Sequence, residues 1–386
     1  YTTEYQIKDS EEWDISENGD KSIIAKWKLK DKSITIFGNG TMKSWDYDST
    51  EDWHKKYKNV IEKVIIENGV LNIGKLSFFG CSSLTSIEIP NSVTSIGNSS
   101  FLNCISLTSI TIPESLTSIG SFAFEDCRSL TSITIPKNVT SIGWDRFEGC
   151  NSLTKIDVSD ANTKLISIDG VLYNKEKTLL IQYPSNKSDK EFSIPNSVTF
   201  IGQFAFSKCS SLTSITIPES VTCITWCAFD RCNSLANIIL PGNLTDIYEY
   251  AFSECKNLIN LKIPNSVNNI EEGAFDDVKN IVCKTNSYAH KYAEENKVLY
   301  ILDDEVPTVT AKYSTKEKTN KNVTVTLTAN EEVQEINGWI LSKDKKQLTK
   351  EYSNNTTETI TIKDLVGNET KQTIIINNID KTPEQV

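Results

Sequence analysis

The stretch "SLTSITIPESLTSIGSFAFEDC", Ser106 to Cys127, repeats nearly the same phrase, and its pattern returns 23 residues later. One cysteine marks each copy at this spacing, at Cys81, Cys104, Cys127 and Cys150 and, after a gap, at Cys209, Cys232 and Cys255. A Phe lies three residues before each of these cysteines and a Leu three residues after it. Self-similarity at a fixed period of this length is typical of stacked repeat architectures.

Each copy contains three short segments with different signals. "LTSITIP" alternates apolar and polar residues and ends in Pro, which predicts a short strand. "SVTSIG" predicts a second extended segment, with Gly at a sharp corner. "FAFEDC" places Phe and Cys on one face of a helical turn. A single coil cannot bury its own apolar edge, so the sequence predicts a mainly β solenoid of leucine-rich-repeat type, with short helical turns and coils stacked through parallel strands.

The cysteine ladder predicts buried free thiols, because a small apolar group that recurs once per coil fits one packing slot. Zinc requires ligands that converge on one point, whereas this ladder supplies a row of single thiols. Cys223, Cys227 and Cys283 fall outside the ladder and are interpreted as packing residues, with a local Cys223–Cys227 bridge as the alternative.

Departures from the repeat define the predicted domains. Residues 1–66 are expected to cap the first coil, with a hairpin or strand pair around residues 38–40. Residues 67–302 are expected to form the solenoid. Beyond residue 306 the chain has short alternating strands separated by turn residues, so residues 306–386 predict a β-sandwich of immunoglobulin-like type.

Two further features are expected inside the solenoid. The period fails over residues 160–195, where "LISIDGVLYNKEKTLLIQYP" predicts an enlarged coil with a β-hairpin that turns at residues 174–177. Near the end of the solenoid, helical spacing of apolar residues predicts a terminal helix over residues 286–296, which would cap the last coil.

The repeated units, with the consensus "SLTSITIPESVTSIGxxAFxxC", closely resemble BspA-like leucine-rich repeat proteins of bacterial surfaces. "SIDGVLYNKEKTLLIQYP" resembles the inserted coil of that family, and the segment from "NVTVTLTAN" to "IDKTPE" is similar to tandem bacterial immunoglobulin-like modules. The resemblance implies an exported protein placed at the cell surface, adhesion to host proteins or to other cells, and further tandem modules in the full-length chain.

Composition argues against several function classes. The formal charge of −11 and the pI near 5.0 argue against a nucleic-acid partner, which usually meets a clustered basic face. No run of about 18 apolar residues is present, so no transmembrane segment is expected.

We also expect no catalytic centre, no cofactor and no metal. The two histidines, His54 and His290, lie at opposite ends of the repeat region and are interpreted as surface residues. The acidic stretch from Asp46 to Asp52 is interpreted as a solvated turn, since it lacks the glycine-punctuated spacing of a calcium loop. Repetition does not gather the unlike groups that an active site needs.

The candidate partner-binding residues are the outward positions of the predicted strands and two tryptophans. They are Thr108, Thr111, Thr131, Thr134, Asp157, Thr213, Thr216, Asn237, Ile239, Lys262, Trp144 and Trp226. One interpretation is that Thr suits an exposed strand and was copied with the repeat. The other is a flat face that docks a partner, as extended surfaces of stacked coils do. The two tryptophans are open to either exposed binding or packing on a neighbouring coil.

These observations favour a non-enzymatic, secreted or cell-surface recognition protein. Its solenoid would bind a protein or glycan on host or neighbouring cells, with the immunoglobulin-like module as a spacer. Two alternatives stay open: a carbohydrate-binding module, and a structural envelope protein that associates with its own copies.

Overall fold

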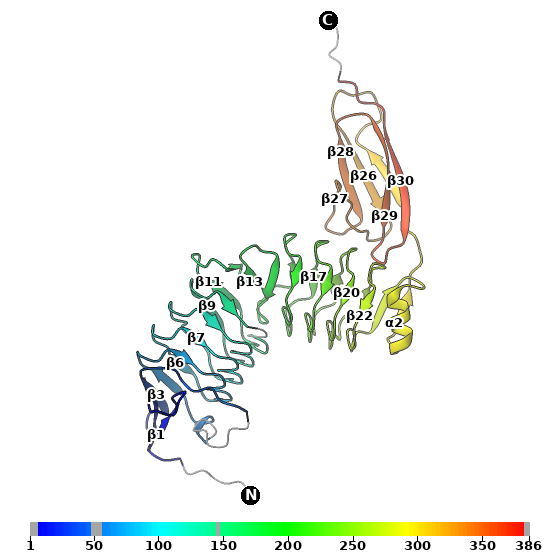
Figure 1. The fold of residues 1–386 in the computed structure, drawn as a ribbon. Coiled ribbons are helices and arrows are strands. Elements are labelled where there is room, and N and C mark those ends of the chain that lie inside the picture. Colours follow the sequence, from blue (N-terminus) through cyan, green and yellow to red (C-terminus); the bar gives the residue numbers. More distant parts are fainter. Residues whose placement is uncertain (1–6, 48–55, 144–146, 382–386) are drawn as a thin grey trace.

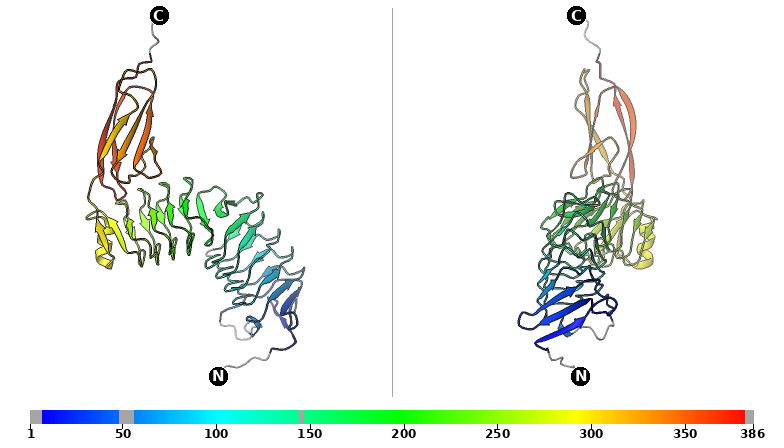
Figure 2. Two further views of the ribbon diagram at one scale, coloured as in Figure 1. Left: turned by 180° about the vertical axis from the view of Figure 1, so that it is seen from behind. Right: turned by 60° about the vertical axis from the view of Figure 1, so that its left-hand side comes forward.

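The computed structural model describes residues 7–47, 56–143 and 147–381. A cap at the N-terminal end leads into a solenoid of flattened coils, which bends near its middle (Figure 1). A separate β domain stands on the last coils, as the views from behind and from the side also show (Figure 2). The predicted solenoid is confirmed.

The N-terminal cap is a three-stranded antiparallel meander that starts the first sheet of the solenoid. Its strands are β1 (Ser10–Asp14), β2 (Ile23–Lys28) and β3 (Ser33–Gly38). The last of them pairs in parallel with β4 (Lys63–Ile66), the first strand of the repeating type.

The expected hairpin around residues 38–40 is wrong, because the β2–β3 turn lies at residues 29–32. Lys32 adopts a positive φ of 44° there, and its N–H donates to the Leu29 carbonyl at 3.1 Å. Gly38 is needed for another reason. A Cβ at this position would lie 1.9 Å from the carbonyl oxygen of Ser22, so only glycine allows the two backbones to approach.

Two lines of short parallel strands run along the N-terminal half of the solenoid. The first line contains β4, β6 (Ser86–Glu88), β9 (Ser132–Ile135) and β11 (Lys155–Val158). The second contains β5 (Asn72–Ile73), β7 (Ser95–Ile96), β8 (Ser118–Ile119) and β10 (Ser141–Ile142). Residues 107–113 of the intervening coil form no strand, although Ile110 and Ile112 are buried there as the pattern predicts.

Phenylalanine rings form one stack inside the coils of each half, from Phe78 to Phe147 and from Phe206 to Phe275. The rings of Phe101 and Phe124 lie 5.5 Å apart and 1° from parallel, and those of Phe229 and Phe252 lie 5.4 Å apart at 1°. Identical slots of successive coils therefore align in columns, as the repeat predicts.

The thiols form a second column beside the rings. Cys127 Sγ donates to the Phe101 carbonyl at 3.3 Å, and Cys232 Sγ donates to the Phe206 carbonyl at 3.0 Å. All ten cysteines are free, and the seven of the ladder are buried. The prediction of buried free thiols is thus confirmed, and each bond ties one coil to the preceding one.

In the N-terminal coils, glycine at the corner is required by close backbone contact between coils, whereas Thr225, Tyr248 and Glu271 take this position in the C-terminal coils. A Cβ on Gly120 would lie 2.5 Å from the backbone nitrogen of Asn98, one coil earlier. A side chain at this corner would force the coils apart.

An enlarged coil interrupts both strand lines. It contains β12 (Leu165–Ile168), β13 (Val171–Asn174) and β14 (Leu179–Gln182), paired antiparallel in sequence, and β14 then pairs in parallel with β16 (Phe200–Ile201). The hydrophobic interior divides here into two clusters, one on each side of β13.

Both strand lines resume in the C-terminal half. One continues through β15 (Glu191–Ser193), β17 (Ser214–Thr216) and β19 (Asn237–Ile239), then β21 (Asn260–Lys262), β23 (Asn280–Cys283) and β24 (Tyr300–Leu302). The other continues through β18 (Cys223–Ile224), β20 (Asp246–Ile247) and β22 (Asn269–Ile270).

A helix, α2 (Tyr288–Asn296), covers the last coil. Its residues Ala289, Tyr292 and Ala293 are buried, and the Tyr292 ring meets the edge of the phenylalanine stack at Phe275, at 5.9 Å and 83°. Among the described residues, no helix has the length and hydrophobicity that a membrane crossing requires.

The C-terminal domain contains two antiparallel sheets around one core. The larger consists of β25 (Val309–Tyr313), β26 (Val323–Ala329), β28 (Gln347–Tyr352) and β27 (Ile340–Leu341), and the smaller of β29 (Thr356–Lys363) and β30 (Glu369–Ile376). Side chains from both sheets, such as Val325 and Ile374, share the core. The immunoglobulin-like assignment stays a prediction.

Direct contacts hold this domain against the solenoid. The backbone N–H of Asn265 donates to the Val366 carbonyl at 3.1 Å, and Asn368 Nδ2 donates to the Asp303 carbonyl at 2.9 Å. The position of the domain on the last coils thus rests on hydrogen bonds that involve the backbone of both parts.

Candidate recognition face and interdomain junction

The first column of predicted contact residues serves the stack itself. The hydroxyl of Thr131 donates to the Thr108 carbonyl at 3.4 Å, and that of Thr213 donates to the Lys190 carbonyl at 2.9 Å. Each hydroxyl satisfies a backbone acceptor of the preceding coil. This column therefore stabilises coil stacking, which supports the structural interpretation of these threonines.

The threonines of the second column differ from those of the first in their hydrogen bonding. The parallel register places Thr134 of β9 beside Asp157 of β11, and Thr216 of β17 beside Ile239 of β19. Thr111 and Thr134 are exposed, and within the described part of the chain the hydroxyls of Thr111, Thr134 and Thr216 make no hydrogen bond. Their hydrogen-bonding capacity is unused by the fold.

The structure separates the predicted residues of the strand face into two groups. The enlarged coil lies between them, with Thr108, Thr111, Thr131, Thr134 and Asp157 on its N-terminal side and Thr213, Thr216, Asn237, Ile239 and Lys262 on its C-terminal side. The N-terminal group ends in a charged pair, since Lys155 Nζ lies 2.7 Å from the Asp157 carboxylate.

Three residues of the C-terminal group line one pocket. Asn237, Ile239 and Lys262 form a wall of a cavity of about 340 Å³, and Glu332 and Leu365 of the C-terminal domain contribute to the same lining. The Lys262 ammonium lies 3.8 Å from the Glu332 carboxylate. The last coils therefore present their strand face together with the C-terminal domain.

The tryptophans do not extend this face. Trp226 follows β18, which belongs to the other strand line, and its ring packs edge-on against Phe204 at 4.8 Å while 36% of its surface stays exposed. Both interpretations of Trp226 thus hold in part, because it packs on a neighbouring coil and is also accessible. Trp144 lies outside the described residues.

The other candidate residues of the sequence fall at the two caps. His290 Nδ1 accepts a hydrogen bond from the Asn286 backbone N–H at 3.1 Å, and the ring packs against Tyr300. Its role in the described structure is to support the terminal helix. His54 and most of the acidic stretch from Asp46 to Asp52 lie outside the described residues.

A larger cleft separates the C-terminal domain from the solenoid. Its volume is about 820 Å³, and its lining is mainly polar, with Glu219, Asn265 and Ser266 from the solenoid and Glu335 and Trp339 from the C-terminal domain. Two buried atoms of this lining, Ser266 Oγ and Trp339 Nε1, have no hydrogen-bond partner among the described residues. Such groups are rare in folded proteins.

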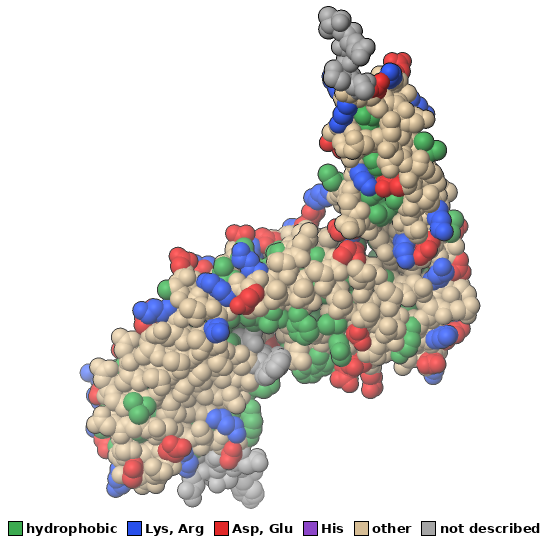
Figure 3. Space-filling view, turned by 45° about the horizontal axis from the view of Figure 1, so that its top comes forward, with side chains coloured by type: hydrophobic (Ala, Val, Ile, Leu, Met, Phe, Trp, Pro, Cys, Tyr) green, Lys and Arg blue, Asp and Glu red, His purple; other side chains and the backbone are tan. Residues whose placement is uncertain are grey.

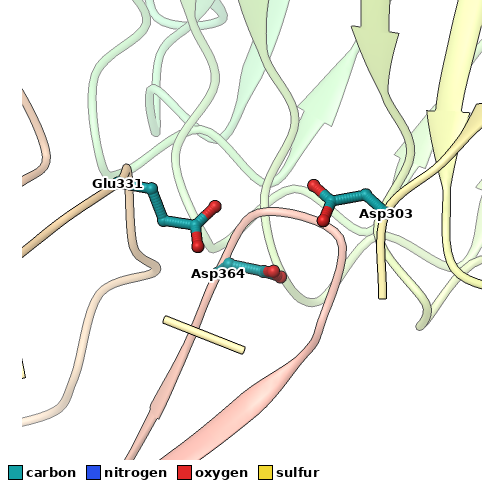
Figure 4. Close-up of side chains that lie close together, drawn as sticks. All are labelled: Asp303, Glu331 and Asp364. Carbon is teal, nitrogen blue, oxygen red and sulfur yellow. The ribbon is translucent and has the colours of Figure 1, made fainter. Parts of the chain in front are cut away.

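Three carboxylates converge at the junction: Asp303, Glu331 and Asp364 (Figure 4). Their nearest oxygens all lie within 4.8 Å of one another. Burial, with the neighbouring negative charge of Asp364 as a further cause, raises the pKa of Asp303 and of Glu331. Asp364 is buried and already accepts backbone hydrogen bonds from Val366, Gly367 and Asn368.

Sequence reasoning missed every residue that the C-terminal domain contributes to the junction. Glu332, Trp339 and Leu365 belong to no repeat and lie far along the chain from the coils they meet. No periodic signal in the sequence indicates that these side chains return to the solenoid.

Comparison with known proteins identifies the repeat region. A family model described as "BspA type Leucine rich repeat region" matches residues 56–175 and 183–291, in six copies. No curated protein matches the chain.

Several solved structures are similar to this chain. The crystal structure of the pneumococcal vaccine antigen PcpA is 24% identical, with 68% of this chain and 80% of that chain covered and a TM-score of 0.55. A leucine-rich repeat protein from Eubacterium ventriosum is 25% identical, with coverage of 70% and 95% and a TM-score of 0.45. A leucine rich cell surface protein from Faecalibacterium prausnitzii is 26% identical, with coverage of 69% and 88% and a TM-score of 0.47.

Proposed function

Because the chain belongs to the BspA-type leucine-rich repeat family, we propose that it is a non-enzymatic recognition protein of the bacterial cell surface. Its partner is a protein or glycan on a host or neighbouring cell. The strand face of the solenoid makes the contact, and the C-terminal domain acts as an immunoglobulin-like spacer.

The observation that carries this proposal is the second column of the strand face. Thr111, Thr134 and Thr216 are exposed or half-exposed, and their side chains form no hydrogen bond to the described residues, in contrast to those of Thr131 and Thr213 in the adjacent column. Repetition presents these hydroxyls at the spacing of the coils, which suits an extended partner surface. Family membership supports the surface location and the recognition role.

Substitution on the strand face tests the proposal in the full chain. The double variant Thr111→Arg, Thr134→Arg introduces two bulky charges at the centre of the N-terminal group. We expect at least a tenfold loss of affinity for the partner found in a screen of extracellular-matrix proteins and glycans. Thr328→Arg is the matched control, because Thr328 is an exposed strand residue of the C-terminal domain. Equal binding by the double variant and the control would exclude the N-terminal group of the strand face as the contact surface.

A carbohydrate-binding role is the second candidate, and the cleft at the junction favours it. The amides of Asn265 and Gln334 and the carboxylates of Glu219 and Glu335, which line the cleft, supply the mixed donors and acceptors that sugar hydroxyls require. A glycan array probed with the wild-type chain and with Glu335→Gln distinguishes the two candidates. This substitution should weaken binding only of a ligand that occupies the cleft.

A further inference from the structure

The second strand line has a regular set of hydrogen bonds between coils. The N–H of Thr117 donates to the Thr94 carbonyl at 2.8 Å, and the N–H of Gly120 donates to the Ile96 carbonyl at 2.8 Å. One coil later, Thr140 and Gly143 donate in the same way to Thr117 and Ile119, at 3.0 and 2.8 Å. Each coil thus offers two carbonyls to the next.

This ladder stops at β10. The carbonyls of Thr140 and Ile142 occupy the two acceptor positions, yet no backbone N–H of the described residues donates to them, and β10 pairs only with β8. The cause is the enlarged coil, where β12, β13 and β14 pair with one another. The ladder resumes only when Thr199 and Gly202 donate to Thr178 and Leu180, both at 2.8 Å.

An apolar groove lies at the interruption. Its volume is about 380 Å³, and its apolar walls come from β10, β12, β14 and β16, through Ile142, Leu165, Leu179, Ile181 and Phe200. Phe200 is 45% exposed, and Ile142, Leu179 and Ile181 are half-buried. Hydrophobic side chains gather on the surface near the middle of the solenoid in the space-filling view (Figure 3).

We propose that this groove binds an extended peptide, which adds to β10 as a parallel strand. Only an extended backbone supplies two N–H donors at the spacing of the Thr140 and Ile142 carbonyls, and its alternate side chains would enter the apolar walls. A lipid chain would fill the groove but leave both carbonyls unpaired. The parallel orientation follows from the register, since all strand pairs of this line in the N-terminal half are parallel.

The peptide that fits carries an apolar side chain between its two N–H donors and a carboxylate toward one end. Lys164 is exposed, lines the same groove and forms no ion pair within the described residues. The site is separate from the strand face of the proposed function, because β10 belongs to the other strand line.

The chain itself provides a probe with the required backbone. The synthetic peptide NSVTSIGN copies residues 91–98, in which Thr94 and Gly97 donate to the carbonyls of Leu71 and Ile73, the positions equivalent to Thr140 and Ile142. Fluorescence anisotropy of the labelled peptide with the full chain measures its affinity. A scrambled peptide is expected to bind at least tenfold more weakly.

Backbone methylation separates strand addition from simple apolar contact. Replacement of Gly97 of the peptide by N-methylglycine removes one donor and should weaken binding at least tenfold. Methylation of the Val93 nitrogen is the matched control, since in the protein that N–H bonds within its own turn, to Pro90. Equal binding of the parent peptide and the two methylated peptides would overturn the proposal and indicate an apolar occupant.

Variants of the groove locate the site. Phe200→Glu should weaken binding of the parent peptide at least tenfold, whereas Phe122→Glu, at a comparably exposed Phe outside the groove, should not. Both variants should keep the thermal midpoint of the wild type, which shows that the fold is intact. Thr134→Arg on the strand face should leave peptide binding unchanged. If Phe200→Glu has no effect, or if the chain without peptide dimerises through this groove, the proposal is wrong.

Discussion

The side chains of Leu172 and Tyr173, neighbours in β13, lie in different hydrophobic cores. Leu172 packs with the N-terminal coils, and Tyr173 packs with the C-terminal coils. Because side chains of a strand alternate between its two faces, β13 forms a partition through the middle of the solenoid. The two halves are therefore packed as separate interiors on one continuous backbone.

This partition predicts that a substitution in the core destabilises mainly the half of the solenoid that contains it. Phe124→Ala and Phe229→Ala each remove a fully buried ring from one stack, and each should cost about 3–5 kcal/mol. Hydrogen exchange with mass spectrometry should show lost protection in the N-terminal coils for the first variant and in the C-terminal coils for the second. Phe200→Ala is the control with a half-exposed ring. Uniform loss of protection across all coils would contradict the partition.

Tyr183 predicts a second, sharper result. It lies 23 residues before Phe206 and stacks on that ring at 5.2 Å, so it fills the phenylalanine slot of the enlarged coil. Its hydroxyl donates to the Asp189 carboxylate at 3.0 Å. Tyr183→Phe should lower the free energy of unfolding by about 1 kcal/mol, the value of one hydrogen bond. Tyr183→Ala should cost about 3–5 kcal/mol, measured by chemical denaturation. Similar losses for both variants would exclude a packing role for the ring.

The thiol column predicts slow and selective reaction with thiol reagents. Burial raises the pKa of Cys81 to about 12 and also raises the pKa of Cys127 well above its ordinary value, so neither forms a thiolate near pH 8 in the folded state. Cys223 is only half-buried and should react first with an aromatic disulfide reagent. The ladder thiols should react only at the rate at which the solenoid opens. Rapid labelling of Cys127 in the native protein would contradict this packing.

The carboxylates of the junction predict a dependence of stability on pH. The pKa values of Asp303 and Glu331 are raised in the folded state, so the folded protein binds these protons more tightly than the unfolded chain. The stabilisation is complete below the ordinary pKa values and is lost as the pH rises through the raised ones. Glu331→Gln should therefore raise the thermal midpoint at pH 7 and have little effect well below pH 4.5.

Two controls complete this experiment. Glu351→Gln removes an exposed carboxylate of β28, away from the cluster, and should leave the midpoint unchanged at both pH values. A chelator in every buffer keeps divalent cations from neutralising the three carboxylates. A lower midpoint for Glu331→Gln at pH 7 would show that the charge stabilises the junction.

The repeat is the part of the molecule that sequence predicts well. Each Phe, Cys and Ile position recurs in many coils of the chain, so a packing interpretation that fits Phe101 and Cys127 also fits the equivalent residues of other coils. The slot of Tyr183 was open to the same reasoning, because its distance from Phe206 equals the period. The β2–β3 turn was misplaced because Gly38 is required by its contact with Ser22, which local sequence does not show.

The candidate sites are less predictable for a physical reason. The strand face follows from alternation, but the interrupted ladder at Thr140 and Ile142 depends on how the enlarged coil pairs with itself. The cleft around Trp339 depends on where the C-terminal domain docks. Neither the strand pairing of the enlarged coil nor the docking of the C-terminal domain can be predicted from residue spacing along the chain.

Many hydrogen bonds between regular coils join residues 23 positions apart, as between Thr117 and Thr94 or Thr154 and Thr131. Duplication or deletion of one regular coil preserves these contacts, whereas an insertion of another length interrupts them locally, as the enlarged coil does. The length of the solenoid can therefore change during evolution in steps of one coil, while the side chains on its surface change one residue at a time.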